Sequence, residues 1–176
     1  LPIRLFKGKP QFGLFRRGSN QTLFIKTCMV HNDTINDVFQ TMMKLLENGP
    51  IKAFDAQNRT GHVKGLAVRV GHQTGEIQVT ILMHHKKELQ TLIQTLVQKH
   101  PRIESVYVTQ SREVKLQDYF NETTALVYGK DTIRATLNGY TYQLLPQSFF
   151  QLNSVVAEAF YDYMIQAANL KKTDIV

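Results

Sequence analysis

The stretch with the most chemical potential lies near the end of the chain, between Tyr140 and Asn153. It reads Tyr-Thr-Tyr-Gln-Leu-Leu-Pro-Gln-Ser-Phe-Phe-Gln-Leu-Asn and runs into a helical pattern from Ser154. A junction between a strand and a helix exposes side chains at the edge of a sheet, and the helix start offers free N–H groups to a ligand. Gln151 lies at this junction. Local physics alone favours a plainer interpretation, a packed phenylalanine pair followed by an Asn N-cap.

A second candidate site is the basic opening of the chain. The formal net charge is +7, and no acidic residue precedes Asp33. Positive charge confined to one segment suggests contact with phosphates, although a solvated basic hairpin is an alternative that the same charges allow. The cations of this segment are Arg4, Lys7, Lys9, Arg16, Arg17 and Lys26.

The remaining reactive side chains form no recognisable catalytic motif. The sequence has no glycine-rich phosphate loop, no H-E-x-x-H helix and no G-x-S-x-G turn. His84 and His85 have no third metal ligand at a suitable spacing, so we interpret them as the end of a strand. The single cysteine, Cys28, can form no disulfide within the chain, and a lone buried thiol is its simplest interpretation.

The composition is that of a globular protein. Hydrophobic residues make up 43% of the 176 residues, with ten Phe and seven Tyr among them. No apolar run reaches the length of a membrane span, and the first residues lack the apolar block of a signal peptide. We therefore expect a cytoplasmic protein without membrane contact.

The hydrophobic pattern predicts an α+β fold, a mostly antiparallel sheet with covering helices. Residues 2–7 and 11–16 are predicted to be strands joined by a turn, and a further strand is predicted over 22–26. Residues 22–108 then give the order strand, helix, strand, strand, helix, strand. This is the order of a split βαβ unit.

After residue 108 the pattern changes to three short strands, over 125–130, 132–137 and 140–145, which predict a C-terminal β-meander. A helix follows, and residues 171–176 read as the start of a new strand, which suggests a piece of a longer protein. We expect one domain over 1–150 and a helix with a linker over 151–176. The helix side chains predicted to face inward are Val155, Val156, Ala159, Phe160, Tyr163, Met164 and Ala167.

Particular residues resemble a known family. The pattern G-x-x-Y-x-x-x-P-x-S-F-F-Q-L-N over Gly139–Asn153 is similar to the central region of RNA uracil-5-methyltransferases. These enzymes methylate C5 of uridine in ribosomal or transfer RNA with S-adenosylmethionine. Gly13–Ser19 and Thr60–Gly71 resemble further parts of the family in the same order, so the resemblance covers nearly the whole chain. The S-F-F-Q-x-N segment is its most specific motif.

The resemblance implies roles for individual residues. In the family, the glutamine of this motif lies at the pocket for S-adenosylmethionine and the target base, so the resemblance implies that place for Gln151. A side-chain amide can both donate and accept, which suits an amino-acid moiety or the edge of a uracil. Phe149 and Phe150 would pack beneath that pocket. Cys28 would be a candidate fourth ligand of a 4Fe-4S cluster whose other cysteines precede Leu1. The residues expected to hold RNA, with ribosomal RNA as the expected substrate, are Arg4, Lys7, Lys9, Arg16, Arg17 and Arg69.

The resemblance also implies parts that this sequence does not contain. A doubly wound methyltransferase domain, with the catalytic cysteine and the general base, would follow residue 176, so we expect no catalytic residue within the chain. The parent enzyme would flip a uridine out of the RNA stack and attack C6 with a thiolate. The expected partners are RNA and the remainder of the chain's own polypeptide. A stand-alone RNA-binding or interaction module without catalysis is the competing hypothesis.

Overall fold

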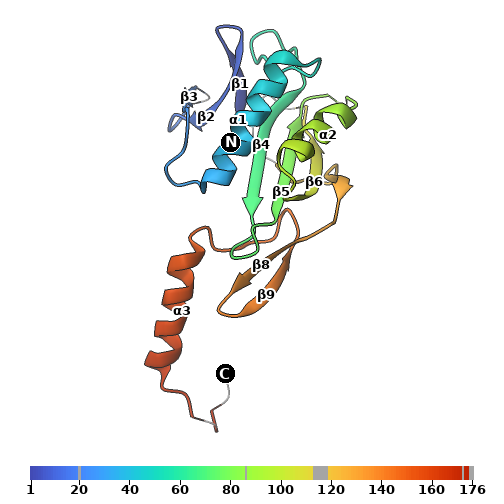
Figure 1. Cartoon of the computed structure of the whole chain (residues 1–176). Helices are drawn as coiled ribbons and strands as arrows, with labels where there is room; N and C mark the ends of the chain where they lie inside the picture. The colour runs from blue at the N-terminus through green and yellow to red at the C-terminus, as the bar shows by residue number, and fades with distance from the viewer. Residues whose placement is uncertain (20, 86, 113–118, 172, 175–176) are drawn as a thin grey trace.

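The computed structural model describes residues 1–19, 21–85, 87–112, 119–171 and 173–174. Within them lie three α-helices and three β-sheets, which confirms the predicted α+β class. Figure 1 shows a body from which the last helix and the smallest sheet extend at one end. The strand expected to begin within 171–176 falls partly outside the described residues.

The largest sheet has the strand order β4-β5-β6-β7. Its strands are β4 (Val63–Val70), β5 (Ile77–Met83), β6 (Ile103–Gln110) and β7 (Ala125–Gly129). β4 and β5 form an antiparallel hairpin, whereas β5 and β6 run parallel because α2 (Gln90–Lys99) carries the chain across between them. β7 returns antiparallel to β6, so the sheet is mixed and mostly antiparallel.

The main hydrophobic core lies between this sheet and two helices. α1 (Asp33–Asn48) begins at Asn32, whose Oδ1 accepts a hydrogen bond of 2.8 Å from the backbone N of Thr34. The core residues from α1 include Val38, Phe39, Met42 and Leu46, and those from β5 are Ile77, Val79, Ile81 and Met83. Because side chains alternate along a strand, Gln78 and Thr80 lie on the opposite face of the sheet.

The opening strands form a sheet of their own. β1 (Ile3–Phe6), β2 (Lys9–Phe15) and β3 (Thr22–Phe24) pair antiparallel in that order, which confirms strands in all three predicted places. β3 pairs with β2 because the short loop after Phe15 returns the chain directly beside it. Residues 22–26 therefore do not start a split βαβ unit, and the order predicted over 22–108 is not formed by one sheet.

The predicted β-meander is also wrong. β7 belongs to the large sheet, while β8 (Ile133–Leu137) and β9 (Tyr140–Leu144) form a separate two-stranded hairpin. Gly129 explains the break, because its φ of 77° is open to glycine and a Cβ there would collide with the backbone oxygen of Glu104. The chain leaves the large sheet at that point.

The β4–β5 turn, residues 71–76, fixes β8 to the body; we call it the anchor turn. Glu76 is buried there and accepts hydrogen bonds of 2.7 Å from both the backbone N and Nε of Arg134. The backbone N of Thr136 donates to the oxygen of His72 at 2.9 Å. A Cβ on Gly71 would collide with the backbone oxygen of Arg134, so glycine permits this close approach.

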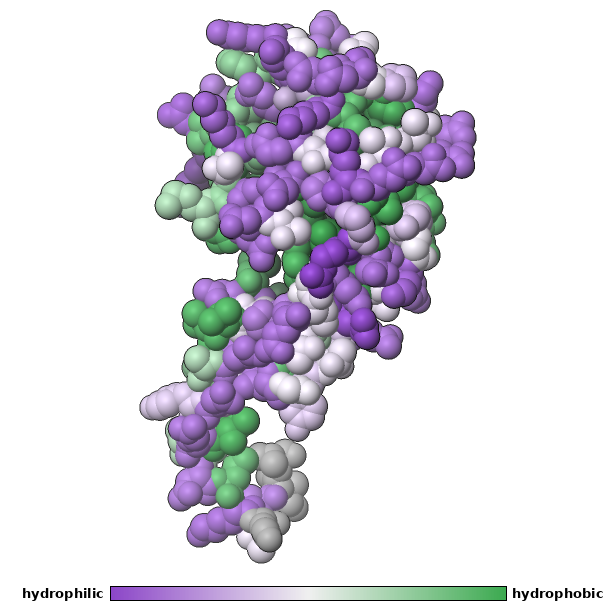
Figure 2. All heavy atoms as spheres, viewed as in Figure 1, coloured by the Kyte–Doolittle hydropathy of each residue, from purple (hydrophilic) through white to green (hydrophobic). Residues whose placement is uncertain are grey.

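The last helix, α3 (Ser154–Ala168), extends away from the body (Figure 1). Its apolar side chains do not face inward as predicted, because the described elements leave most of the surface of the helix uncovered. Figure 2 shows hydrophobic residues exposed along this arm, and Ala157 is the one buried residue in the helix. The exposed residues are Val155, Val156, Ala159, Phe160, Tyr163, Met164 and Ala167. None of the helices in the described ranges has the length and hydropathy needed to cross a membrane.

Replacing Glu76 with Gln tests the anchor turn. The buried carboxylate meets Arg134 Nη2 at 2.6 Å, and its own exposed fraction is 9%. Burial by itself would raise the pKa of Glu76, but hydrogen bonds from Arg134 outweigh it and lower the pKa below its ordinary value. We expect E76Q to lower the free energy of unfolding by about 1–3 kcal/mol, measured by urea denaturation.

Glu104 provides the matched control. It pairs with Lys130 at 3.0 Å, where the two side chains are 35% and 63% exposed. E104Q should change the free energy of unfolding by no more than about 0.5 kcal/mol. Equal effects of the two variants would contradict an anchoring role for Glu76.

Candidate functional site

The segment that carries Gln151 crosses the sheet face opposite the helices. Arg69, on β4, holds it in place by donating to the backbone oxygens of Leu145 at 3.2 Å and Ser148 at 2.6 Å. The Ser148 Oγ accepts from the backbone N of Leu145 at 3.1 Å, which closes the turn around Pro146. Burial lowers the pKa of Arg69. Arg69 thus positions the loop through its guanidinium, and its predicted role as an RNA contact stays a prediction.

The two phenylalanines of the motif behave differently. Phe150 packs against the small cluster formed by Ile133, Ala135 and Leu144, as expected for a side chain beneath a pocket. Phe149 is 83% exposed, so the expectation that both rings pack is wrong for Phe149. Consecutive residues of an extended segment point in opposite directions, and only one of the pair can face the cluster.

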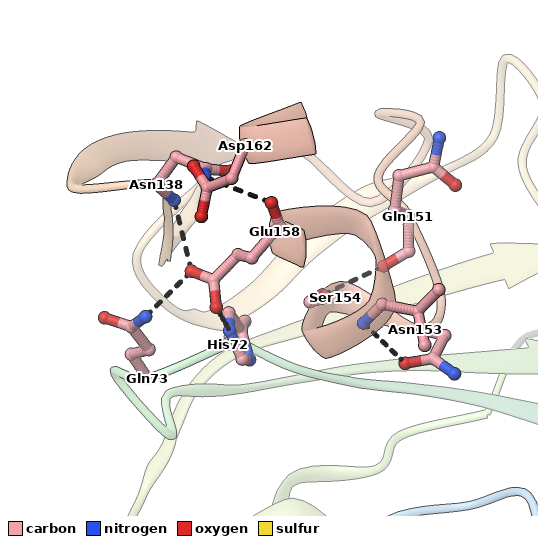
Figure 3. A network of polar contacts seen from close by, with 9 residues as sticks. His72, Gln73, Asn138, Gln151, Asn153, Ser154, Glu158 and Asp162 are labelled. Atoms are coloured by element: carbon pink, nitrogen blue, oxygen red, sulfur yellow. Dashed lines mark hydrogen bonds and ion pairs between the residues drawn. The ribbon is translucent and has the colours of Figure 1, made fainter. Parts of the chain in front are cut away.

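A cavity of about 270 Å³ lies between this loop and the sheet. The polar residues on its walls are Arg69, Gln78 and Thr80 from the strands, Gln151 from the loop and Ser154 from the start of α3. Gln151 is exposed, and within the described residues its side-chain amide makes no hydrogen bond. Figure 3 shows that amide pointing away from the start of α3. The cavity therefore offers a free amide beside a largely apolar wall.

Asn153 caps α3. Its Oδ1 accepts a hydrogen bond of 3.2 Å from the backbone N of Val156, and Ser154 Oγ donates to the oxygen of Gln151 at 3.0 Å. The Asn N-cap interpretation is confirmed. Asn153 starts the helix, and Gln151, two residues earlier, stays available to a ligand.

A second polar network fixes the direction of α3 (Figure 3). Glu158 accepts hydrogen bonds from Gln73 at 2.9 Å and from the backbone N of Asn138 at 3.1 Å, and it meets His72 Nε2 at 3.1 Å. Asn138 Nδ2 also donates to Asp162 at 2.7 Å. The helix is thus joined to the anchor turn and to the β8–β9 turn. The hydrogen bond from His72 is the largest cause that lowers the pKa of Glu158.

The predicted RNA-binding cations separate into two groups. Lys7, Lys9, Arg16 and Arg17 are exposed, and Lys9 meets Glu47 at 3.7 Å. Arg4 is buried, with 9% of its surface exposed, and burial lowers its pKa. Its guanidinium donates to the backbone oxygens of Ile3 and Lys64 at 2.8 and 2.9 Å. Arg4 is therefore a structural residue, and its prediction as a surface contact is corrected.

Cys28 is half-buried, and its backbone is held by the side chain of Asn36 through hydrogen bonds of 3.0 and 3.1 Å. Among the residues that the structure describes, no group of three or more His, Cys, Asp or Glu side chains could hold a metal ion. A 4Fe-4S cluster needs four thiolates and the sequence contains one cysteine, so the residues present do not fit a cluster.

Sequence reasoning missed Gln78 and Thr80, which line the cavity, and Glu158, which fixes α3. The alternation of polar and apolar residues in β5 is the signal that could have found the first two. No local signal marks Glu158, because its partners lie far away in the sequence.

Known proteins resemble this chain in sequence and in fold. No protein-family model matches the chain. An uncharacterized RNA methyltransferase of Streptococcus pyogenes is 29% identical over 178 residues, covering 100% of this chain and 38% of the relative. A second, from Streptococcus mutans, is 28% identical and is covered over 39% of its length.

Over its whole length the chain is similar to curated proteins that are named uncharacterized RNA methyltransferases. This confirms the resemblance found in the sequence. The chain spans about two fifths of the length of the curated RNA methyltransferases that it matches.

The fold has a counterpart among solved structures. The crystal structure of Pyrococcus abyssi tRNA (uracil-54, C5)-methyltransferase in complex with S-adenosyl-L-homocysteine superposes with a TM-score of 0.71 at 20% identity. The match covers 94% of this chain and 40% of the archaeal enzyme. At this level of identity the similarity concerns the fold.

The pH dependence of α3 tests the Glu158 network. The pKa of Glu158 is lower in the folded protein than its ordinary value. The stabilisation that the Glu158 carboxylate gives to the folded protein is therefore present above the ordinary pKa and is lost as the pH falls through the folded-state pKa. We expect the amide NMR signal of Asn138 to shift with a midpoint below 4.5, the ordinary value for Glu. The E158Q variant should abolish the shift, and a midpoint at or above 4.5 in the wild type would contradict the network.

Proposed function

We propose that this chain is the central region of a longer enzyme, an S-adenosylmethionine-dependent RNA (uracil-5-)-methyltransferase. The observation that carries the proposal is the similarity to RNA methyltransferases over the entire chain, which nevertheless spans 38% of the first relative. The fold shared with a tRNA uracil-C5 methyltransferase supports uridine C5 as the target atom.

The proposal divides the chain into two parts. Residues 1–150 form the RNA-binding and substrate domain, and residues 151–176 form the helix and linker that lead to a methyltransferase domain. The exposed apolar side chains of α3 support this division, because Val156, Phe160 and Met164 are 59%, 56% and 48% exposed. A helix with such a face is stable in water when another element covers it. The remainder of the enzyme would do so.

Gln151 is the residue of this chain that we assign to the cofactor and target-base pocket. The cavity beside Gln151 measures about 270 Å³, whereas pockets that enclose drug-sized ligands measure roughly 300–1,000 Å³. The residues that line the cavity would therefore form one wall of a larger pocket. S-adenosylmethionine, when bound, supplies the methyl group. The amide of Gln151 would hydrogen-bond the amino-acid moiety of the cofactor or the edge of the uracil. Arg69 and Asn153 keep the loop in place on either side of it.

The chemical step would belong to the rest of the enzyme, and no catalytic residue is assigned here. The exposed cations Lys7, Lys9, Arg16 and Arg17 would hold RNA, with ribosomal RNA as the proposed substrate and the cytoplasm as the proposed location. Cys28 would ligate a 4Fe-4S cluster only with cysteines supplied from outside this chain.

Tritium release tests the proposed reaction. Methylation at C5 expels the hydrogen of that carbon, so the complete gene product, given S-adenosylmethionine and RNA carrying [5-³H]uridine, should release tritium into water. We expect Q151A to lower kcat/KM about tenfold, the scale of one lost hydrogen bond. Q143A, which changes an exposed glutamine on β9, is the control and should leave the rate unchanged. No release by the wild-type protein would favour an RNA-binding module without catalysis.

A further inference from the structure

The opening sheet displays a pair of aromatic rings that the main core does not use. Phe6 is 44% exposed, and Phe24 is half-buried beside it. Their ring centroids lie 5.0 Å apart, with the ring planes tilted by 44°. We call these two residues the aromatic pair.

The register of the sheet explains why the pair stays outside the core. Ile3 and Phe12 are partners across β1 and β2, and both are buried in the main core. Phe6 is paired with Lys9, and successive residues of a strand alternate between the two faces, so Phe6 lies on the other face. Phe24 is paired with Gly13, which has no side chain to cover its ring. An apolar surface is therefore left at the Phe6 end of this face, whereas Arg4, on the same face, is buried.

Positive charge surrounds the aromatic pair. The Nζ of Lys7 lies 5.6 Å from the centroid of the Phe6 ring, within the range of a cation–π contact. Lys9 lies within β2 and is paired with Phe6, and Lys26 follows β3; both are exposed. No acidic residue occurs before Asp33 in the sequence, but Glu47 of α1 meets Lys9 at 3.7 Å. Lys7 and Lys26 form no ion pair within the described residues, and these cations beside aromatic rings suit a polyanion that carries flat apolar groups.

We propose that the aromatic pair is a stacking platform for an unpaired RNA base, with the surrounding cations holding the adjoining phosphates. The inference rests on the proposed function in one respect, that the partner is RNA, and it names the class as single-stranded RNA. Bases in a duplex stack on each other and hide their faces, whereas unpaired bases stack on aromatic side chains. Phosphates at neighbouring positions meet lysine and arginine.

The alternative occupant is a protein segment covering the two rings. Such a segment would have to be acidic to match the cations, and its binding would not depend on the aromatic character of Phe6. Replacing the ring with an aliphatic side chain of similar size therefore separates the two occupants. Phe6→Leu keeps an apolar side chain and removes the π face.

The experiment measures binding of this 176-residue chain to a fluorescein-labelled unstructured RNA of about ten nucleotides, by anisotropy over a range of salt concentrations. We expect F6L to raise Kd about tenfold without changing the salt slope, because stacking involves no counterion release. R16A/R17A should weaken binding and reduce the slope by about 1.4, because two phosphate contacts are lost. L23A alters an exposed leucine beside Phe24, and it should bind like the wild type.

Two further measurements keep the result unambiguous. Circular dichroism checks that F6L is folded, and F24L provides an independent second variant. Replacing one base of the RNA with 2-aminopurine should give fluorescence quenching with the wild type that F6L reduces.

Three outcomes would overturn the platform. They are equal affinity of wild type and F6L, equal affinity of the wild type for single-stranded and duplex RNA, and no binding of RNA at all. The first two leave the RNA role of the proposed function intact. The third removes the platform and the RNA role of this chain, while tritium release by the complete gene product still decides the reaction separately.

Discussion

The buried carboxylate of Glu76, held by Arg134, is the contact on which the arrangement of the C-terminal part depends. It fixes β8 to the anchor turn through the backbone N and the guanidinium of Arg134. A buried carboxylate without such a partner would be costly, so the pair specifies where β8 must lie. Once β8 is placed, Asn138 at the end of the hairpin meets Glu158, and α3 takes its direction from that contact. Arg69 then sets the loop that carries Gln151.

The two ends of the molecule expose different surfaces. The body presents the opening sheet, with an aromatic pair among cations. The arm presents an apolar helix and a free amide, both of which would be incomplete sites by themselves. In the proposed function, the opening sheet would hold RNA and α3 would join a catalytic domain.

Local sequence patterns predict most of the helices and strands. The wrong predictions about the fold concern contacts between segments that are separated in the sequence. The order strand, helix, strand, strand, helix, strand predicted over 22–108 is confirmed along the chain, because apolar spacing and alternation report burial directly. The pairing of β3 with β2, and of β7 with β6, depends on a short loop and on Gly129, which strand patterns do not reveal. The apolar pattern of α3 predicted a helix correctly but not its exposure, since periodicity identifies a face and not what covers it.

The candidate site shows the same limit. The motif singled out Gln151, which lies in a cavity wall, and its role in binding stays a prediction. Charge counting placed Arg4 among the surface cations, but its guanidinium lies 5.8 and 5.9 Å from the rings of Phe15 and Phe54, inside the protein. A count of charges contains no information on burial. Arg69 likewise became a positioning residue only when its acceptors in the loop were known.

We propose that α3 packs against the catalytic domain of a longer methyltransferase. Amide hydrogen exchange tests this contact most directly. In this chain alone, the amides of α3 beyond Glu158 and Asp162 should exchange rapidly, because the helix is held near one end. In the complete gene product the same amides should exchange at least about tenfold more slowly, since a covering domain would prevent local opening. Equal exchange rates in the two proteins would contradict the account.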